Sequence, residues 1–183
     1  TSVVEMLVQG GADLNAKDSQ GRTAIFYSAT ENMMLFLQQM GLDPRSVDKQ
    51  KRSLLYTAVQ LRREALFQVL VVSYKMDLME RDKSKATLLH HAAYCGEVRF
   101  MRYILQNTSL DPSVVDKNRQ TPLYYAAARG HTAAIKLLLM VMDDDVMREK
   151  LVDLRDTQGR SALDAAAFGR HDGCVMELAS HMT

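Results

Sequence analysis

The chain has 183 residues and a formal net charge of +1, and its 25% charged and 47% apolar residues are ordinary values for a globular domain. The strongest apolar run, residues 66–72, is far shorter than the roughly 20 residues that span a bilayer, so no transmembrane segment is predicted. Residues 1–5 lack the basic start and the cleavage site of a signal peptide, and we therefore expect an intracellular, cytoplasmic protein. Cys95 and Cys174 are then expected to be free thiols.

The first predicted element is a helix near the start of the chain. Val3, Val4, Leu7 and Val8 recur at helical spacing, and the segment 10–16 reads Gly-Gly-Ala-Asp-Leu-Asn-Ala. Residues 1–17 match only the back half of the repeats that follow. We therefore expect the chain to begin inside a repeat and to be a fragment of a longer protein.

Five further repeats each open with an aspartate that has a hydroxyl residue five positions later. The opening segments are Asp18–Thr23, Asp48–Ser53, Asp82–Thr87, Asp116–Thr121 and Asp156–Ser161. The aspartates recur at intervals of 30 to 40 residues, which is typical of stacked helical repeats. These repeats predict a single domain that spans residues 1–183. It begins with a partial leading repeat at 1–17. Repeats one to five follow at 18–47 (shortened), 48–81, 82–115, 116–155 (with an insertion) and 156–183.

Each repeat predicts a helix, a tight turn, a longer helix and an exposed loop. The hydroxyl residue can accept a hydrogen bond from a backbone N–H and so start the first helix, and Pro122 occupies a first helical position. Gly96, Gly130 and Gly169 are expected to end the first helix in a left-handed conformation. Apolar residues at helical spacing, as in 135–142, predict the second helix.

Three repeats deviate from this pattern. Repeat one is short and lacks the glycine near residues 31–32, and repeat two has Arg62 in its place, so we expect its turn to be distorted or a continuous bend. Repeat four carries extra residues in 141–150, which predict an additional helical turn or a short surface excursion.

The residues after each hydroxyl carry a family resemblance. Residues 121–131 read Thr-Pro-Leu-Tyr-Tyr-Ala-Ala-Ala-Arg-Gly-His, and 87–96 and 161–169 are close variants. This pattern resembles the ankyrin repeat, T-P-L-H-x-A-A-x-x-G-H. The resemblance implies an all-α solenoid of stacked helix–turn–helix units with projecting β-hairpin-like fingers, acting as a protein–protein interaction scaffold. It also implies that His90, His131 and His171 brace turns, whereas Asp164 in place of the motif histidine leaves the brace of repeat five in question.

The resemblance further implies that the partner binds a concave face made of the fingers and the first helices. The positions that it indicates are Arg22, Lys49, Gln50, Arg52, Lys83, Ser84, Lys117, Asn118, Gln120, Gln158 and Arg160 on the fingers, and Gln60, Leu61, Tyr94, Cys95, Ala128, Arg129 and Phe168 on the first helices.

The four-residue finger tips carry basic side chains and no acidic ones. The basic residues are Arg22, Lys49, Lys51, Arg52, Lys83, Lys85, Lys117, Arg119 and Arg160. A row of positive tips is expected to steer an acidic partner onto this face. The alternatives are that the tips are merely solvated loops, that they bind a polyanion such as nucleic acid or an anionic lipid surface, or that the array regulates an enzyme elsewhere in a longer chain. Nucleic acid is ranked well below a protein partner because the charge is too dilute.

No pattern for chemistry stands out. His91 and Cys95 have helical i, i+4 spacing, but zinc requires three or four ligands, so a structural role is favoured for them and for His90. The acidic triplet 143–145 lacks the spaced ligands and the glycine of a calcium loop. We therefore expect no cofactor, no metal ion and no enzymatic activity.

Overall fold

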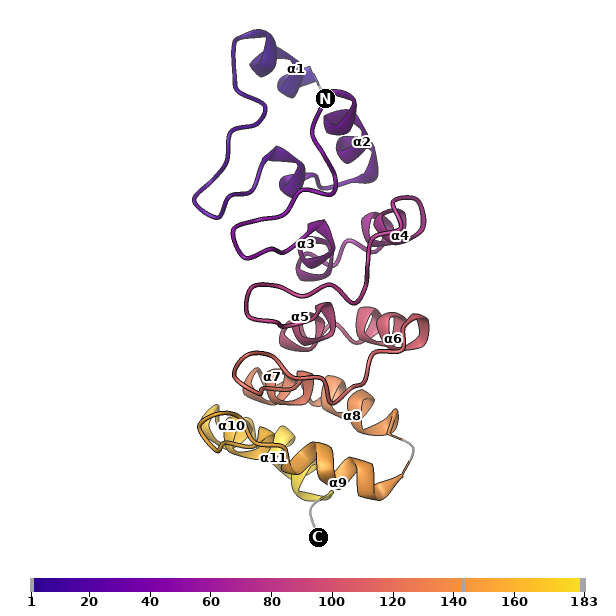
Figure 1. The fold of residues 1–183 in the computed structure, drawn as a ribbon, viewed down its shortest axis with the longest axis vertical. Helices are drawn as coiled ribbons and strands as arrows, with labels where there is room; N and C mark the ends of the chain where they lie inside the picture. Colours follow the sequence, from indigo (N-terminus) through magenta and orange to yellow (C-terminus); the bar gives the residue numbers. More distant parts are fainter. Residues whose placement is uncertain (1, 143, 182–183) are drawn as a thin grey trace. The chain divides into compact units, whose positions relative to one another are not determined.

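The computed structural model describes residues 2–142 and 144–181, and over these residues the protein is all α-helical (Figure 1). The acidic triplet is thus described only in part, because residue 143 lies outside the described residues. The chain divides into two compact units, Thr1–Asp77 and Leu78–Thr183, called unit 1 and unit 2 below. Each unit is built from the helix pairs that the repeat predicts, which confirms the all-α fold class.

Unit 1 contains α1 (Ser2–Gln9), a short 3₁₀ helix η1 (Ala24–Tyr27), α2 (Glu31–Gln39), α3 (Leu54–Gln60) and α4 (Glu64–Val72). Helix η1 packs on α2, α2 on α4, and α3 on α4. Ile25, Met34, Leu55 and Leu70 are fully buried between these helices. Burial of each such side chain contributes about 1.5–3 kcal/mol.

Unit 2 contains α5 (Leu88–Cys95), α6 (Val98–Asn107), α7 (Pro122–Ala128), α8 (Thr132–Met140), α9 (Asp145–Asp153), α10 (Ala162–Phe168) and α11 (Asp172–Ala179). The first helices α5, α7 and α10 pack side by side in one layer, and α6, α8 and α11 form the second (Figure 1). Leu89, Leu123, Ile135 and Leu178 are fully buried, so the core lies between the two layers.

The hydroxyl residues cap most of the first helices as predicted. Thr121 Oγ1 accepts a hydrogen bond from Tyr124 N at 3.2 Å, and Ser53 and Ser161 do the same for residues in their own first turns. Thr23 is an exception, because its buried Oγ1 has no hydrogen-bond partner among the described residues. The helix that follows Thr23 is only the four-residue η1, so the deletion in repeat one shortens the first helix itself.

Two of the predicted turns are wrong in detail. Arg62 is left-handed with φ 55°, and Arg63 N donates to Ala58 O at 2.8 Å, so the turn of repeat two is regular rather than distorted. Gly96 and Gly130 are left-handed as expected, but Gly169 has φ −75° and Arg170 is the left-handed residue. The left-handed residue therefore stays nine positions after the hydroxyl residue, where Arg170 replaces the usual glycine, and the turn keeps its closing hydrogen bond from His171 N to Ala166 O.

Asp164 stands where the repeat motif has a histidine, so the brace of this turn was in question. In the structure Asp164 still makes the bracing hydrogen bonds to Ser161. Its carboxylate accepts hydrogen bonds from Ser161 N and Ser161 Oγ, both at 2.8 Å, while Ser161 Oγ accepts from Asp164 N. These backbone and side-chain hydrogen bonds hold the pKa of the Asp164 carboxyl below its ordinary value. The pair forms a capping box, which satisfies two N–H groups at the helix start.

The insertion in repeat four forms a complete helix, α9, rather than an extra turn or an irregular excursion. Asp144 caps it by accepting from Met147 N at 2.7 Å. Leu151 and Val152 are buried, and Arg148 donates to the carbonyls of Leu139 and Met142. The helix is therefore packed against the carboxyl end of α8.

Candidate partner-binding surface

The fingers are tight turns organised by the aspartate that opens each repeat. In the finger 116–121, Asp116 Oδ1 accepts from Asn118 N at 2.8 Å and from Gln120 N at 2.9 Å, and Asp116 N donates to Gln120 O. The same bonds recur in all five fingers. The carboxylates thus turn inward, while the tips face solvent. Among the described residues the hairpin character is limited to one isolated bridge, Arg81 with Thr87.

The fourth residue of each finger is left-handed. Two of these residues are glycines, and the other three are Lys51 (φ 61°), Lys85 (φ 63°) and Arg119 (φ 59°). A left-handed conformation costs a residue with a Cβ roughly 1–2 kcal/mol. Glycine would therefore be the more favourable residue at these three tip positions, and a lysine or arginine occupies each of them despite this conformational cost.

Three finger arginines are paired within their own finger. Arg52 contacts the Asp48 carboxylate through Nε at 2.9 Å and Nη2 at 2.7 Å, and Arg22 and Arg160 pair in the same way with Asp18 and Asp156. Burial alone would raise the pKa of Asp156, but Arg160 and the backbone N–H groups bring it below its ordinary value. The sequence-based count of basic tips thus overstates the charge offered to a partner.

Four exposed cations lie on the first two finger tips of unit 2, namely Lys83, Lys85, Lys117 and Arg119, and are called the basic row below. Their fingers are joined by main-chain hydrogen bonds, Lys117 N to Ser84 O and Thr157 N to Asn118 O, both at 2.8 Å. The basic row is therefore carried by one continuous, backbone-linked set of loops.

The first helices of unit 2 add three exposed side chains to this surface. Tyr94 is 42% exposed at the end of α5, and Phe168 is 94% exposed at the end of α10. The Arg129 guanidinium lies over the Tyr94 ring, 4.7 Å from its centroid. Ala128 and Cys95 are half-buried beside them. We call the fingers and first helices of unit 2 its finger face.

The remaining predicted residues of unit 2 differ in what they do. Ser84 Oγ donates to Asp82 Oδ1, and Gln120 Nε2 donates to Asp156 Oδ2 at 3.1 Å, so both stabilise the fingers. Asn118 and Gln158 are exposed.

In unit 1 the predicted residues lie on two fingers and on α3. Lys49 N donates to Gln20 O at 2.8 Å and Lys49 Nζ to Ser19 O at 2.9 Å, which joins the two fingers. Gln50 is exposed on the second finger, and Gln60 and Leu61 are exposed at the carboxyl end of α3.

The three histidines brace turns as predicted. His90 is fully buried, accepts at Nδ1 from Thr87 N at 3.1 Å and donates from Nε2 to Gln120 O at 3.1 Å. Burial lowers the pKa of His90 to about 4, which keeps the ring in the neutral form that these bonds require. His131 and His171 donate from Nε2 to the carbonyls of Tyr94 and Ala128, at 3.0 and 3.3 Å.

Tyr125 belongs to this surface but was not predicted. Its hydroxyl donates to Asp116 Oδ2 at 2.9 Å, and its ring meets those of His90 and Tyr94 edge-on. Burial, followed by the Asp116 charge, raises the pKa of Tyr125. The sequence contained a pattern that could have predicted this hydrogen bond, because Tyr27 also lies nine residues after the aspartate of its finger. In the structure the Tyr27 hydroxyl donates to Asp18 Oδ2 in the same way.

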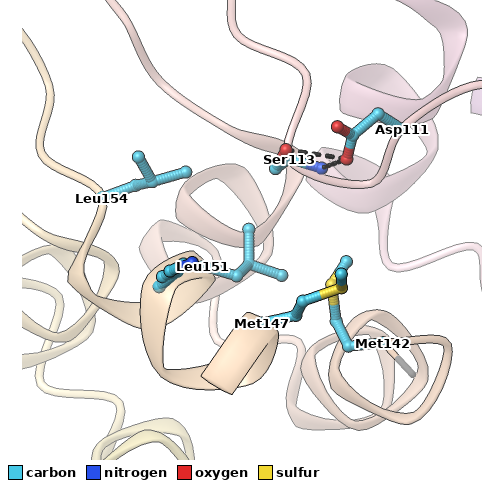
Figure 2. A pocket seen from close by; sticks show the side chains of 7 residues that line it. Asp111, Ser113, Met142, Met147, Leu151 and Leu154 are labelled. Carbon is cyan, nitrogen blue, oxygen red and sulfur yellow. Dashed lines mark hydrogen bonds between the residues drawn. The ribbon is translucent and has the colours of Figure 1, made fainter. Parts of the chain in front are cut away.

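A hollow lies against α9 (Figure 2). It has a volume of about 330 Å³ and is lined by Asp111, Ser113, Met142, Met147, Lys150, Leu151 and Leu154. Asp111 Oδ1 accepts from both Ser113 N and Ser113 Oγ at 2.7 Å, as Figure 2 shows. The lining is mostly apolar and can take an apolar side chain. It depends on the α9 insertion, whose helical form the sequence did not reveal.

The His91–Cys95 pair does not assemble a metal site. Cys95 Sγ lies 3.8 Å from His91 Nε2, and within 2–142 and 144–181 no three His, Cys, Asp or Glu side chains are grouped to hold a metal ion.

Comparison with known proteins agrees with this architecture. The family model for ankyrin repeats (3 copies) matches residues 67–149 and 89–183, and the chain therefore belongs to the ankyrin-repeat family. No curated protein matches the chain. Ankyrin repeats are generally protein–protein interaction modules and typically non-catalytic. None of the helices in the described part of the chain is long and apolar enough to cross a membrane.

Proposed function

We propose that the finger face of unit 2 binds an acidic segment of a partner protein. The observation that supports this proposal is the basic row, which projects from backbone-linked fingers whose own carboxylates are turned inward and hydrogen-bonded. Complementary charge on a partner favours fast and specific association. Unit 1, taken by itself, has candidate partner-binding residues of the same kind: Lys49, Gln50 and Lys51 on its second finger, and Gln60 and Leu61 on α3.

Charge reversal on the fingers tests this function. The probe is a fluorescein-labelled peptide of glutamate and aspartate residues, and its binding is followed by fluorescence anisotropy at low and at physiological salt. The double variant Lys83→Glu/Lys117→Glu is compared with Lys150→Glu, which reverses an exposed lysine on α9. Each exposed ion pair contributes about 0.2–1 kcal/mol, so removing two attractions and adding two repulsions is expected to weaken binding about tenfold.

Two results would contradict the proposal. One is a loss of binding free energy in Lys150→Glu that reaches half of the loss in the double variant, since Lys150→Glu makes half of the charge change and binding would then follow net charge rather than the basic row. The other is a duplex DNA oligonucleotide that binds more tightly than the peptide with a steep salt dependence, which would indicate a polyanion site.

A further inference from the structure

Three residues of the finger face occupy the same place on successive helices. Tyr94, Ala128 and Phe168 are each the seventh residue of α5, α7 and α10. Because α7 packs against α5 on one side and α10 on the other, Ala128 lies between the two aromatic residues. Neighbouring helix axes are about 8–10 Å apart, so the row has one short side chain flanked by two rings. We call these three residues the aromatic row.

The aromatic row exposes apolar surface to solvent. Phe168 is 94% exposed, and Tyr94 keeps 42% of its surface in water. Arg129 stacks on the Tyr94 ring and places a cation next to Ala128. Tyrosine and arginine are among the residue types that dominate binding energy at protein interfaces.

The backbone beneath the row is fixed by the following repeats. The carbonyls at a helix end have no partner inside the helix. Here the Tyr94 carbonyl accepts from His131 Nε2 at 3.0 Å, and the Ala128 carbonyl accepts from His171 Nε2 at 3.3 Å. A surface that is already ordered loses little conformational entropy on binding.

The charge around the aromatic row indicates which kind of partner segment binds there. The basic row stands on the fingers that precede α5 and α7, and Arg129 adds a cation beside Ala128. We propose, on the basis of the function proposed above, that the partner segment combines acidic residues with one large aromatic side chain. That side chain lies on Ala128 between Tyr94 and Phe168, while the flanking carboxylates meet Arg129 and the basic row.

Two labelled peptides separate this inference from the proposed function. One is a short acidic peptide with a single central phenylalanine, and its twin has alanine at that position. Fluorescence anisotropy measures the affinity of the unmodified chain for each. Because a buried phenylalanine side chain contributes far more than an alanine methyl, the first peptide is expected to bind about tenfold more tightly or better.

Two variants and one control locate the preference. Phe168→Ala removes an exposed ring, and Ala128→Trp fills the central position; in both variants the ratio of the two peptides' affinities is expected to fall below about threefold. Val146→Ala, which removes a 56% exposed side chain on α9, is expected to keep the full preference.

The outcomes are distinguishable. If the unmodified chain binds both peptides equally, and Lys83→Glu/Lys117→Glu still weakens both, the aromatic-row inference is wrong and the charge-based function stands. A preference that survives Phe168→Ala and Ala128→Trp also overturns the inference. If neither peptide binds at low salt, both proposals fail.

Discussion

Replacing Gly96 by alanine tests whether histidine contacts between repeats hold unit 2 together. Gly96 ends α5 with φ 72°, and a Cβ attached to it would lie 2.6 Å from His131 Nδ1 and 2.8 Å from His131 Cε1. Such distances are not sterically possible, so the imidazole must move. Its hydrogen bond to the Tyr94 carbonyl would then be lost.

The expected cost has two parts. The left-handed conformation costs an alanine about 1–2 kcal/mol. Loss of the His131–Tyr94 hydrogen bond adds about 0.5–1.5 kcal/mol. Gly96→Ala should therefore lower the free energy of unfolding by about 1.5–3.5 kcal/mol.

Gly159→Ala is the matched control, because Gly159 has φ 76° in the same unit, but a Cβ attached to it would have no described atom within 4 Å. It should show only the conformational part, about 1–2 kcal/mol. Urea unfolding followed by far-UV circular dichroism measures both variants. Equal losses in the two would refute the histidine-contact reasoning. So would full additivity of Gly96→Ala with His131→Ala, since two changes that remove one contact should not add.

Two further predictions concern titration and backbone strain. Since the pKa of His90 is about 4 in the folded chain and near 6.5 when unfolded, the unfolded chain takes up the proton first. The free energy of unfolding should thus fall by up to about 3 kcal/mol as the pH drops from 6.5 to 4, and a His90→Asn variant compared over the same pH range should lack this slope. Arg170→Gly should stabilise the chain by up to about 1 kcal/mol in urea unfolding because Arg170 is left-handed (φ 55°), whereas Arg102→Gly within α6 should destabilise it by a similar amount. An unchanged or lower stability for Arg170→Gly would contradict the strain argument.

Much of the fold can be predicted from the sequence because its organising contacts are local. Asp116 bonds the N–H groups of residues two and four positions ahead, and the caps act within three residues. The Arg52–Asp48 pair is also local, so its i, i+4 spacing could have corrected the charge count. Tyr125 could have been found from the spacing that it shares with Tyr27.

The sequence by itself determined the repeat, the finger turns and the helix starts, since each depends on residues a few positions apart. The tertiary structure decided the contacts that join one repeat to the next. His131 reaches the Tyr94 carbonyl 37 residues away, and His171 reaches that of Ala128 43 residues away. The packing of the insertion as a helix, with Arg148 bonded to the carbonyls of Leu139 and Met142, was likewise decided by the tertiary structure. These features arise because stacking neighbouring helix pairs sets which distant atoms meet, and local sequence patterns do not encode that geometry.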